Sequence, residues 1–330
     1  MQHNKNTRTD ADKARKLLEV YNGETDDFFK LWPEDKSYFF SSDQKAFIAY
    51  SIKRKVAICM GDPAGAAKSI NSLLKEFKQY CLDNGWIIAF IQTNHKYHRA
   101  YTAIGLHSIL IGADAVINLE YFTNSTIHNK YFRNLVNRYN KNGLEVDAYP
   151  PPHDSKLIKE LNKVSESWIT LPHRKEWSFL TGRFEKDYLQ YATLYVLRDK
   201  QGKALAFANE LPSFKPGFTT IDLMRHNSDA PTNSMDLLFI RIMQIKNKEG
   251  YSGFNLGMSP LDGKPFADNL FANLLILLYK KSDIFIGFKG LHQFKAKYEP
   301  KWEPRYVWYQ GSPARLPQIG WGVFGLMSGS

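Results

Sequence analysis

The sequence predicts an α/β (α+β) fold of two similar halves, each a mixed, mostly antiparallel sheet flanked by helices. Strand-like apolar runs alternate with segments of helical periodicity, and glycine or proline ends most of them. The order of sheet strands, helix, strand and second helix also occurs twice along the 330 residues. Apolar residues make up 43% of the chain, so each half has enough of them to bury a core.

The first half begins with a strand-turn-strand pattern and a third strand that ends at a glycine-rich turn. The next segment has Ile70, Leu73, Leu74, Phe77 and Cys81 on one helical face. The predicted elements are Ser37–Tyr50 (two strands), Lys55–Met60 (strand), Gly61–Gly65 (turn), Ala66–Asn84 (helix), Trp86–Gln92 (strand), Tyr97–Ile104 (helix) and Leu106–Ile111 (strand).

The second half repeats this order after a strand and a run of three prolines. Leu157, Leu161, Val164 and Trp168 lie on one face of its first predicted helix. The predicted elements are strand Leu144–Tyr149, helix Asp154–Trp168, hairpin strands Tyr191–Arg198 and Ala204–Leu211, strand Thr219–Arg225, helix Ser234–Lys248, strand Tyr251–Met258 and a helix over about Asp268–Lys280.

These elements predict four parts along the chain. Residues 1–30 are a polar extension with a first helix, and residues 31–128 form the first half. Residues 129–143 form a basic helix between the halves, with Tyr131, Leu135 and Tyr139 as its buried stripe. Residues 144–330 form the second half.

The charge of the chain favours polyanionic partners. Lys and Arg number 44 against 33 Asp and Glu, a net charge of +11. Such an excess suits nucleic acid or an anionic membrane surface, although a generally basic surface is the alternative. The longest apolar helical stretch, Leu270–Tyr279, has about half of the roughly 20 residues that a membrane span needs, so we expect a soluble protein.

Cysteine and histidine usage predicts neither disulfides nor a metal site. Cys59 and Cys81 are the only cysteines, which excludes a disulfide framework and fits a reducing compartment. The histidines do not follow a metal-binding spacing, and we expect no metal; those considered are His95, His98, His107 and His173.

Four segments occur in a characteristic order: Ile221–His226 (IDLMRH), Phe254–Pro260 (FNLGMSP), Gly290–Tyr298 (GLHQFKAKY) and Trp302–Tyr306 (WEPRY). Together they resemble the cytosolic C-terminal domain of bacterial aminoacyl-phosphatidylglycerol synthases, the phosphatidylglycerol lysyltransferase family. The similarity covers about residues 30–312. It implies two tandem acyltransferase domains of the GNAT type, an analogy that does not by itself establish function.

The resemblance implies an enzyme that transfers an amino acid from aminoacyl-tRNA to a glycerol hydroxyl of phosphatidylglycerol. Lysine is the first candidate and alanine the main rival. Such a reaction changes the surface charge of the membrane and is associated with antimicrobial peptide resistance. The activated ester needs no cofactor. The implied partners are Lys-tRNA, phosphatidylglycerol and an anionic membrane, at the inner face of the bacterial cell membrane.

Four residues are the candidate catalytic groups. Asp222 and Arg225 lie three apart in a predicted strand, so they face opposite sides unless the strand ends or bulges between them. The resemblance implies site roles for Lys295 and Glu303, with Glu303 on the ammonium group of the transferred amino acid. Either Asp222 or Glu303 is the expected base. A structural ion pair is the alternative reading for both carboxylates.

The candidate binding residues follow from charge and from glycine geometry. Glu303 and Arg305 flank Pro304 and are expected to share one side of the chain. Gly257 would allow close approach and offer an N–H to an oxyanion. The expected substrate contacts are Arg305, Asn255, Gly257, Arg183 and Lys297. The expected tRNA or phosphate contacts are Lys130, Arg133, Arg138, Lys141, Lys289 and Lys301.

Two other functions fit the same sequence. A peptidoglycan-precursor aminoacyltransferase also uses charged tRNA and paired GNAT folds. A non-catalytic nucleic-acid or membrane-binding module on the same scaffold is the second alternative. The ordered motifs and the retained carboxylates and lysines favour the lipid aminoacyltransferase.

Overall fold

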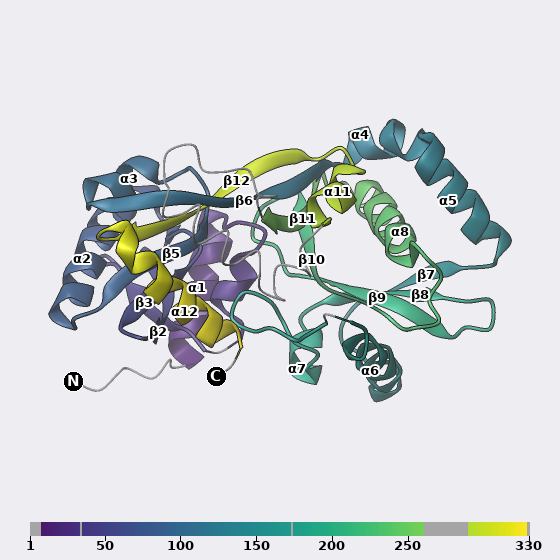
Figure 1. The fold of residues 1–330 in the computed structure, drawn as a ribbon, viewed down its shortest axis with the longest axis horizontal. Helices are drawn as coiled ribbons and strands as arrows, with labels where there is room; N and C mark the ends of the chain where they lie inside the picture. Colours follow the sequence, from purple (N-terminus) through teal and green to yellow (C-terminus); the bar gives the residue numbers. More distant parts are fainter. Residues whose placement is uncertain (1–7, 34, 173, 261–289, 329–330) are drawn as a thin grey trace.

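A computed structural model describes residues 8–33, 35–172, 174–260 and 290–328. Its centre is a single 12-stranded sheet with helices on both faces (Figure 1). The predicted fold class is therefore confirmed. The strand order is β1-β2-β3-β5-β12-β6-β11-β10-β9-β8-β7, with β4 paired to β2.

The strands are β1 (Ser37–Phe40), β2 (Ala46–Lys53), β3 (Val56–Met60), β4 (Ala64–Gly65), β5 (Ile87–Thr93), β6 (Leu106–Asn118), β7 (Glu145–Tyr149), β8 (Thr193–Arg198), β9 (Ala204–Glu210), β10 (Phe218–His226), β11 (Gly253–Pro260) and β12 (Lys301–Gln310). Among the described neighbours, β3 with β5 and β10 with β11 run parallel, and the other pairs run antiparallel.

The α-helices are α1 (Arg8–Tyr21), α2 (Ile70–Asp83), α3 (His98–Ala103), α4 (Leu119–Asn124), α5 (Lys130–Lys141), α6 (Ser155–Ile169), α7 (Lys186–Leu189), α8 (Ser234–Lys248), α11 (Leu291–Ala296) and α12 (Leu316–Met327). Short 3-10 helices are η1 (Asp27–Lys30), η2 (Ala67–Ser69), η3 (Thr126–His128) and η4 (Pro313–Arg315). Figure 1 shows α8 and α6 on opposite sides of β8 and β9.

The repeated order predicted from the sequence is present. In each half, one hairpin strand leads through a helix to a parallel neighbour: β3, α2 and β5 in the first, β10, α8 and β11 in the second. However, β12 lies between β5 and β6, so one sheet passes through both halves. The boundary expected at residues 129–143 remains a prediction. The helix expected over about Asp268–Lys280 lies outside the described residues.

The strand β6 is longer than predicted. The sequence predicts an end at Ile111, but the strand continues to Asn118. A Cβ atom at position 112 would lie 2.4 Å from the carbonyl oxygen of Ser259, so the close approach of β11 requires glycine there. Gly112 contacts β11, and Asp114 contacts both β11 and β12. A local sequence pattern does not reveal such contacts between strands.

The sheet opens between β10 and β11. These strands pair only over three positions, which end at Thr220 and Asn255, and β10 then follows β9 while β11 follows β6. The corresponding strands of the first half, β3 and β5, stay paired over all five residues of β3. An opening at the parallel pair is therefore a feature of the second half.

The C-terminal helix α12 was not predicted. It packs on β2 and β3 through Leu316, Ile319, Gly322 and Gly325, which recur every three residues. A Cβ at position 322 would lie 3.0 Å from Cδ1 of Ile58, so this glycine lets the helix approach the sheet closely. By contrast, a Cβ at position 320 would meet nothing within 4 Å.

We predict opposite effects for two glycine substitutions in α12. Gly320→Ala should raise the free energy of unfolding by about 0.5–1 kcal/mol, because alanine restricts the unfolded chain and favours the helix. Gly322→Ala should not raise the free energy of unfolding, because the added Cβ would displace the side chain of Ile58. Urea denaturation of both variants measures the difference, and equal stabilisation by both would contradict the packing described here.

Candidate active site

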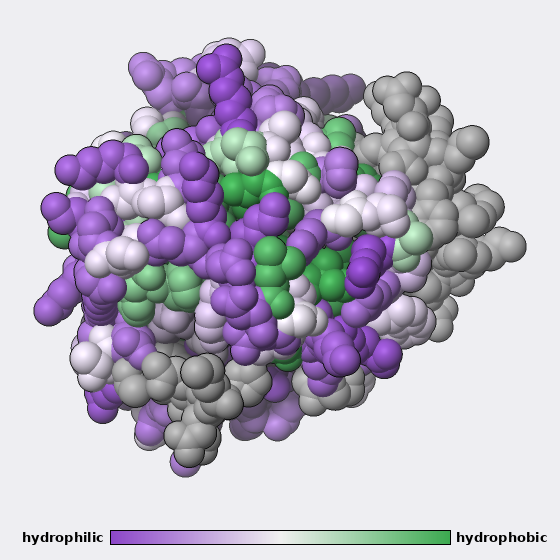
Figure 2. Space-filling model, turned by 90° about the vertical axis from the view of Figure 1, so that its left-hand side faces the viewer, coloured by the Kyte–Doolittle hydropathy of each residue, from purple (hydrophilic) through white to green (hydrophobic). Residues whose placement is uncertain are grey.

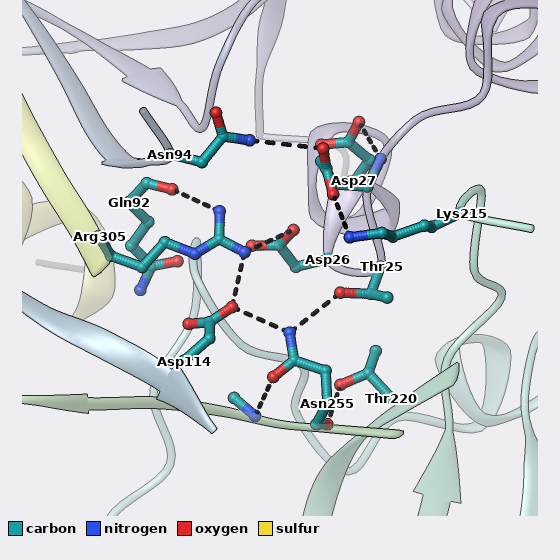
Figure 3. A network of polar contacts seen from close by, with 12 residues as sticks. Thr25, Asp26, Asp27, Gln92, Asn94, Asp114, Lys215, Thr220, Asn255 and Arg305 are labelled. Atoms are coloured by element: carbon teal, nitrogen blue, oxygen red, sulfur yellow. Dashed lines mark hydrogen bonds and ion pairs between the residues drawn. The ribbon is translucent and has the colours of Figure 1, made fainter. Parts of the chain in front are cut away.

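A buried ionic network lies where β12, β6 and β11 meet (Figure 3). Nη2 of Arg305 donates to Oδ2 of Asp114 at 2.6 Å, and Nδ2 of Asn255 donates to the same oxygen at 2.9 Å. All three side chains are buried. Burial opposes the charge on Arg305, but Asp26 and Asp114 outweigh it and raise the pKa of the guanidinium. Arg305 therefore stays charged inside the protein.

Residues near the N-terminus complete this network. Oγ1 of Thr25 accepts a hydrogen bond from Asn255 at 3.1 Å, and Oδ1 of Asp26 lies 3.9 Å from Arg305. Nη1 of Arg305 donates to the carbonyl oxygen of Gln92 at 3.2 Å. Arg305 thus joins the segment before η1 to three strands, and its donors are largely engaged.

Lys295 is a second buried cation beside this network. It lies in α11, and its Nζ donates to the carbonyl oxygens of Gly257 and Met258 at 2.9 and 3.0 Å. No carboxylate of the described residues lies within ion-pair distance of Nζ. Burial lowers the pKa of Lys295 to about 8, and the opposing effect of Asp114 is smaller. A buried amine without a counter-ion is suited to an anionic group of a substrate.

The amide of Gly257 is not free for an oxyanion in this structure. Its N–H donates to Oδ1 of Asn255 at 2.8 Å. The residue has a φ of +76°, which glycine adopts without strain. The glycine therefore shapes the turn that brings two carbonyl oxygens to Lys295, and the donor expected from the sequence is already used.

Asp222 lies at a bulge of β10. The register with β9 shifts between Ile221 and Met224. Oδ2 of Asp222 accepts hydrogen bonds from the hydroxyl of Tyr188 and from the N–H of Gly182. Burial raises the pKa of Asp222 to about 6, even though Tyr188, Gly182 and Arg225 favour the charged form. A carboxyl group that titrates near neutral pH is suited to general-base catalysis.

Arg225 is buried in a polar and aromatic cage. It forms an ion pair with Glu176 and donates to Oγ of Ser165, and the ring of Trp168 lies 4.8 Å from the guanidinium carbon. Glu176 belongs to the same loop as Gly182, which contacts Asp222. The bulge thus lets both Asp222 and Arg225 contact one loop. Strict alternation along a strand would place them on opposite faces, and a bulge is the exception that the sequence analysis allows.

Glu303 and Arg305 share a face of β12, as their spacing predicts. In the register with β6, Glu303 lies directly opposite Asp114. Two carboxylates at such a position repel unless cations compensate them. Arg305 pairs with Asp114, and Lys301 lies 3.1 Å from Glu303. Both carboxylates therefore have a cationic partner in this structure.

The other expected contacts lie in different surroundings. Nζ of Lys297 pairs with buried Asp236, which also accepts hydrogen bonds from Tyr131 and Tyr298. Arg183 is partly exposed beside Glu185, at 3.1 Å. Lys301 is exposed. Lys289 lies outside the described residues.

The basic helix lies within the range of residues 129–143 that the sequence predicts. α5 covers Lys130–Lys141, and Asn129 caps its first turn by accepting from the N–H of Phe132. The predicted buried stripe was wrong in one position, because Phe132 is buried and Tyr131 instead reaches Asp236 with its hydroxyl. The basic side chains are exposed: Lys130, Arg133, Arg138 and Lys141.

Two polar residues of this region were missed in the sequence. Asp114 lies three residues beyond the predicted end of its strand, so the sequence analysis did not single it out. Tyr188 contacts Asp222 from 34 positions away, and no local pattern indicates that. Among the described residues, no cluster of His, Cys, Asp and Glu is arranged to hold a metal. None of the described helices has the length and hydrophobicity to cross a membrane.

Comparisons with known proteins identify relatives of most of this chain. The family profile "Phosphatidylglycerol lysyltransferase, C-terminal" matches residues 15–309. The phosphatidylglycerol lysyltransferase of Staphylococcus epidermidis is 32% identical over 282 residues, which are 85% of this chain and 33% of the relative. That of Bacillus subtilis is 31% identical over 278 residues, 84% of this chain and 32% of the relative. The chain thus spans about a third of the length of these relatives.

Solved structures show the same fold. The structure of L-PGS from Bacillus licheniformis has a TM-score of 0.85 and 31% identity, and the match covers 97% of both chains. FemX has a TM-score of 0.62 over 94% of this chain and 98% of its own, at 10% identity, which is a likeness of fold alone. With a profile that matches most of its residues, this chain belongs to the phosphatidylglycerol lysyltransferase C-terminal family.

Proposed function

We propose that this chain transfers an amino acid, with lysine as the first candidate, from aminoacyl-tRNA to a glycerol hydroxyl of phosphatidylglycerol. Family membership supports the reaction class. The observation that carries the proposal is the presence of two ionisable groups, partly buried Asp222 and buried Lys295, at the opening of the sheet. The last paired positions of β10 and β11 are Thr220 and Asn255. Asp222 lies two residues beyond this pair on β10. Gly257, whose carbonyl oxygen accepts from Lys295, lies two residues beyond it on β11.

The reaction is a transesterification. The acceptor hydroxyl oxygen attacks the ester carbonyl carbon while its proton passes to the Asp222 carboxylate. The tetrahedral oxyanion forms near the Lys295 ammonium, which stabilises its charge. Collapse breaks the bond to the tRNA ribose oxygen, and the proton held by Asp222 passes to that oxygen. Both substrates supply all the atoms, and the ester energy drives the exchange.

Of the two opposed carboxylates on β6 and β12, the one on β12 suits the ammonium group of the amino acid. Glu303 is partly exposed, whereas Asp114 is buried and neutralised by Arg305. Glu303 is therefore the proposed ammonium contact, and Arg305 and Asn255 are positioning residues. Arg225 is proposed to act through the loop that holds Asp222, since its guanidinium is enclosed by Glu176, Ser165 and Trp168.

The exposed cations of α5 are the proposed contacts for the tRNA backbone. Their side chains project from one helix without an acidic residue in it. Phosphate contacts of this kind give binding that weakens strongly with salt. The reaction would take place at the inner face of the cell membrane, where charged tRNA and phosphatidylglycerol are both present.

We predict that Asp222→Asn lowers kcat by about 10²–10⁴-fold with little change in KM, because the amide cannot take the proton. The assay incubates the chain with individually charged, radiolabelled tRNAs and mixed lipids and separates the lipids by chromatography. Asp229→Asn is the control, an exposed carboxylate that pairs with Lys203. If wild type labels no phospholipid, or labels only a peptidoglycan precursor, the proposed function is wrong.

The pH dependence of transfer should be bell-shaped. Below about pH 6 Asp222 is protonated and cannot act as a base, and above about pH 8 Lys295 loses its charge. Lys295→Arg should extend activity to higher pH, because arginine stays protonated. Rates corrected for spontaneous hydrolysis of the aminoacyl ester measure this profile. If the transfer rate of Lys295→Arg falls at the same high pH as that of the wild type, Lys295 is not the group responsible for the fall.

Removing two exposed cations from α5 should weaken tRNA binding and its salt dependence. Arg133→Ala with Lys141→Ala should reduce the slope of log affinity against log salt by about 1–2, because each phosphate contact releases close to one counterion. Filter binding over a salt series measures the slope. Lys159→Ala with Lys163→Ala on α6 is the matched control, and equal slopes for both pairs would exclude α5 as the tRNA contact.

A further inference from the structure

The outward face of α12 is apolar and lies on the surface. Its inward positions are Leu316, Ile319, Gly322 and Gly325, and the face between them carries Trp321, which is 60% exposed, and partly buried Phe324. Surface helices normally present polar side chains outward. In α12 the only polar side chain is Gln318, and its Nε2 donates to the carbonyl oxygen of Arg54 at the base of the helix.

An aromatic row continues from α12 onto the loop before α7. The ring of Trp321 lies 6.0 Å from that of Phe324, which lies 6.0 Å from that of Trp177. The N–H of Ser178 donates to the carbonyl oxygen of Met327 at 2.9 Å and fixes the loop to the end of α12. Figure 1 shows α12 in yellow with its C-terminal end beside this loop.

Exposed basic residues surround the aromatic row. Lys175 lies over the Trp177 ring at 4.7 Å, and Arg315 lies at the start of α12. The further exposed cations are Arg54 and Lys55 in the turn between β2 and β3, and Arg174 in the loop. After Glu303 the sequence contains no acidic residue. Figure 2 shows the left-hand side of the view in Figure 1, whose surface is largely hydrophilic with small hydrophobic patches between the polar side chains.

We propose that α12 and the loop of residues 174–178 dock this chain on an anionic phospholipid surface. Trp321, Phe324 and Trp177 would insert at the level of the head groups, where large aromatic rings are favoured. The surrounding lysines and arginines match the negative charge of the lipids, at about fivefold in affinity for each charge near the surface. Charge complementarity selects this partner over a second copy of the chain, because that face is basic and self-repelling.

The docking surface is joined to the candidate active site by one short segment. Glu176 pairs with Arg225, Trp177 contacts Phe324, and Gly182 donates to Asp222. A bilayer against α12 therefore lies next to the loop that holds the proposed base. This part of the inference rests on the proposed function, whereas membrane binding itself can be measured without any transfer reaction.

Sedimentation with vesicles tests the surface directly. The wild-type chain should bind vesicles of phosphatidylglycerol and phosphatidylcholine and bind pure phosphatidylcholine vesicles much less. Trp321→Glu should weaken binding about tenfold or more, because an aromatic ring that would enter the bilayer is replaced by a charge. Arg54→Ala with Lys55→Ala should weaken it severalfold and reduce its salt dependence. Leu82→Glu is the control, since Leu82 is 47% exposed on α2, which packs on the opposite face of the sheet.

Three results would overturn the proposal: no preference of the wild type for anionic vesicles, unchanged binding by Trp321→Glu, or a dimer that Trp321→Glu dissociates. Transfer to dispersed short-chain phosphatidylglycerol separates this inference from the proposed function. Trp321→Glu should retain transfer in that format and lose it on vesicles. A wild type that binds vesicles but transfers nothing in either format would contradict the proposed function alone.

Discussion

The ion pair between Arg305 and Asp114 is the interaction on which the arrangement of this protein depends. A buried guanidinium is tolerated only with partners, and here they come from β6, β5 and the segment before η1. These partners are far apart in the sequence, and β12 itself comes from near the chain end. Removing one member of such a pair typically costs about 3–5 kcal/mol, because a charge is left buried without compensation. The ion pair therefore helps to hold β12 in its place between β5 and β6.

The opening of the sheet creates the chemistry of the second half. Once β10 and β11 separate, β10 carries Asp222 at its bulge, and β11 offers the carbonyl oxygens that accept from Lys295 of α11. Burial raises the pKa of Asp222 and lowers that of Lys295, so an acid and an amine both titrate near neutral pH. The first half keeps β3 and β5 paired and offers no comparable opening among its described residues. The two halves of the repeated fold thus differ at the same pair of strands, and the proposed site lies in the half where the pair opens.

Much of the fold follows from local sequence patterns. The periodicity of α2, α5 and α6 predicts helices within a few residues of their observed bounds, because each buries one apolar stripe. The motif residues of β10, β11 and β12 were identified differently, through the resemblance of their segments to a known family. The prediction ended β6 too early, at Ile111. Gly112 and Asp114 lie beyond that point and contact the neighbouring strands. The prediction also failed at Tyr131, since the hydroxyl of that residue has a partner on α8.

The sequence by itself determined the family, the repeated order of elements and the residues that carry charge in apolar strands. Only the tertiary structure decided what those charges face. Arg225 is enclosed, Glu303 stays partly exposed opposite Asp114, and the amide of Gly257 is already bonded. The insertion of β12 between β5 and β6 and the apolar outward face of α12 were equally hidden. Each depends on contacts between residues distant in the chain, which periodicity over one helix or strand does not encode.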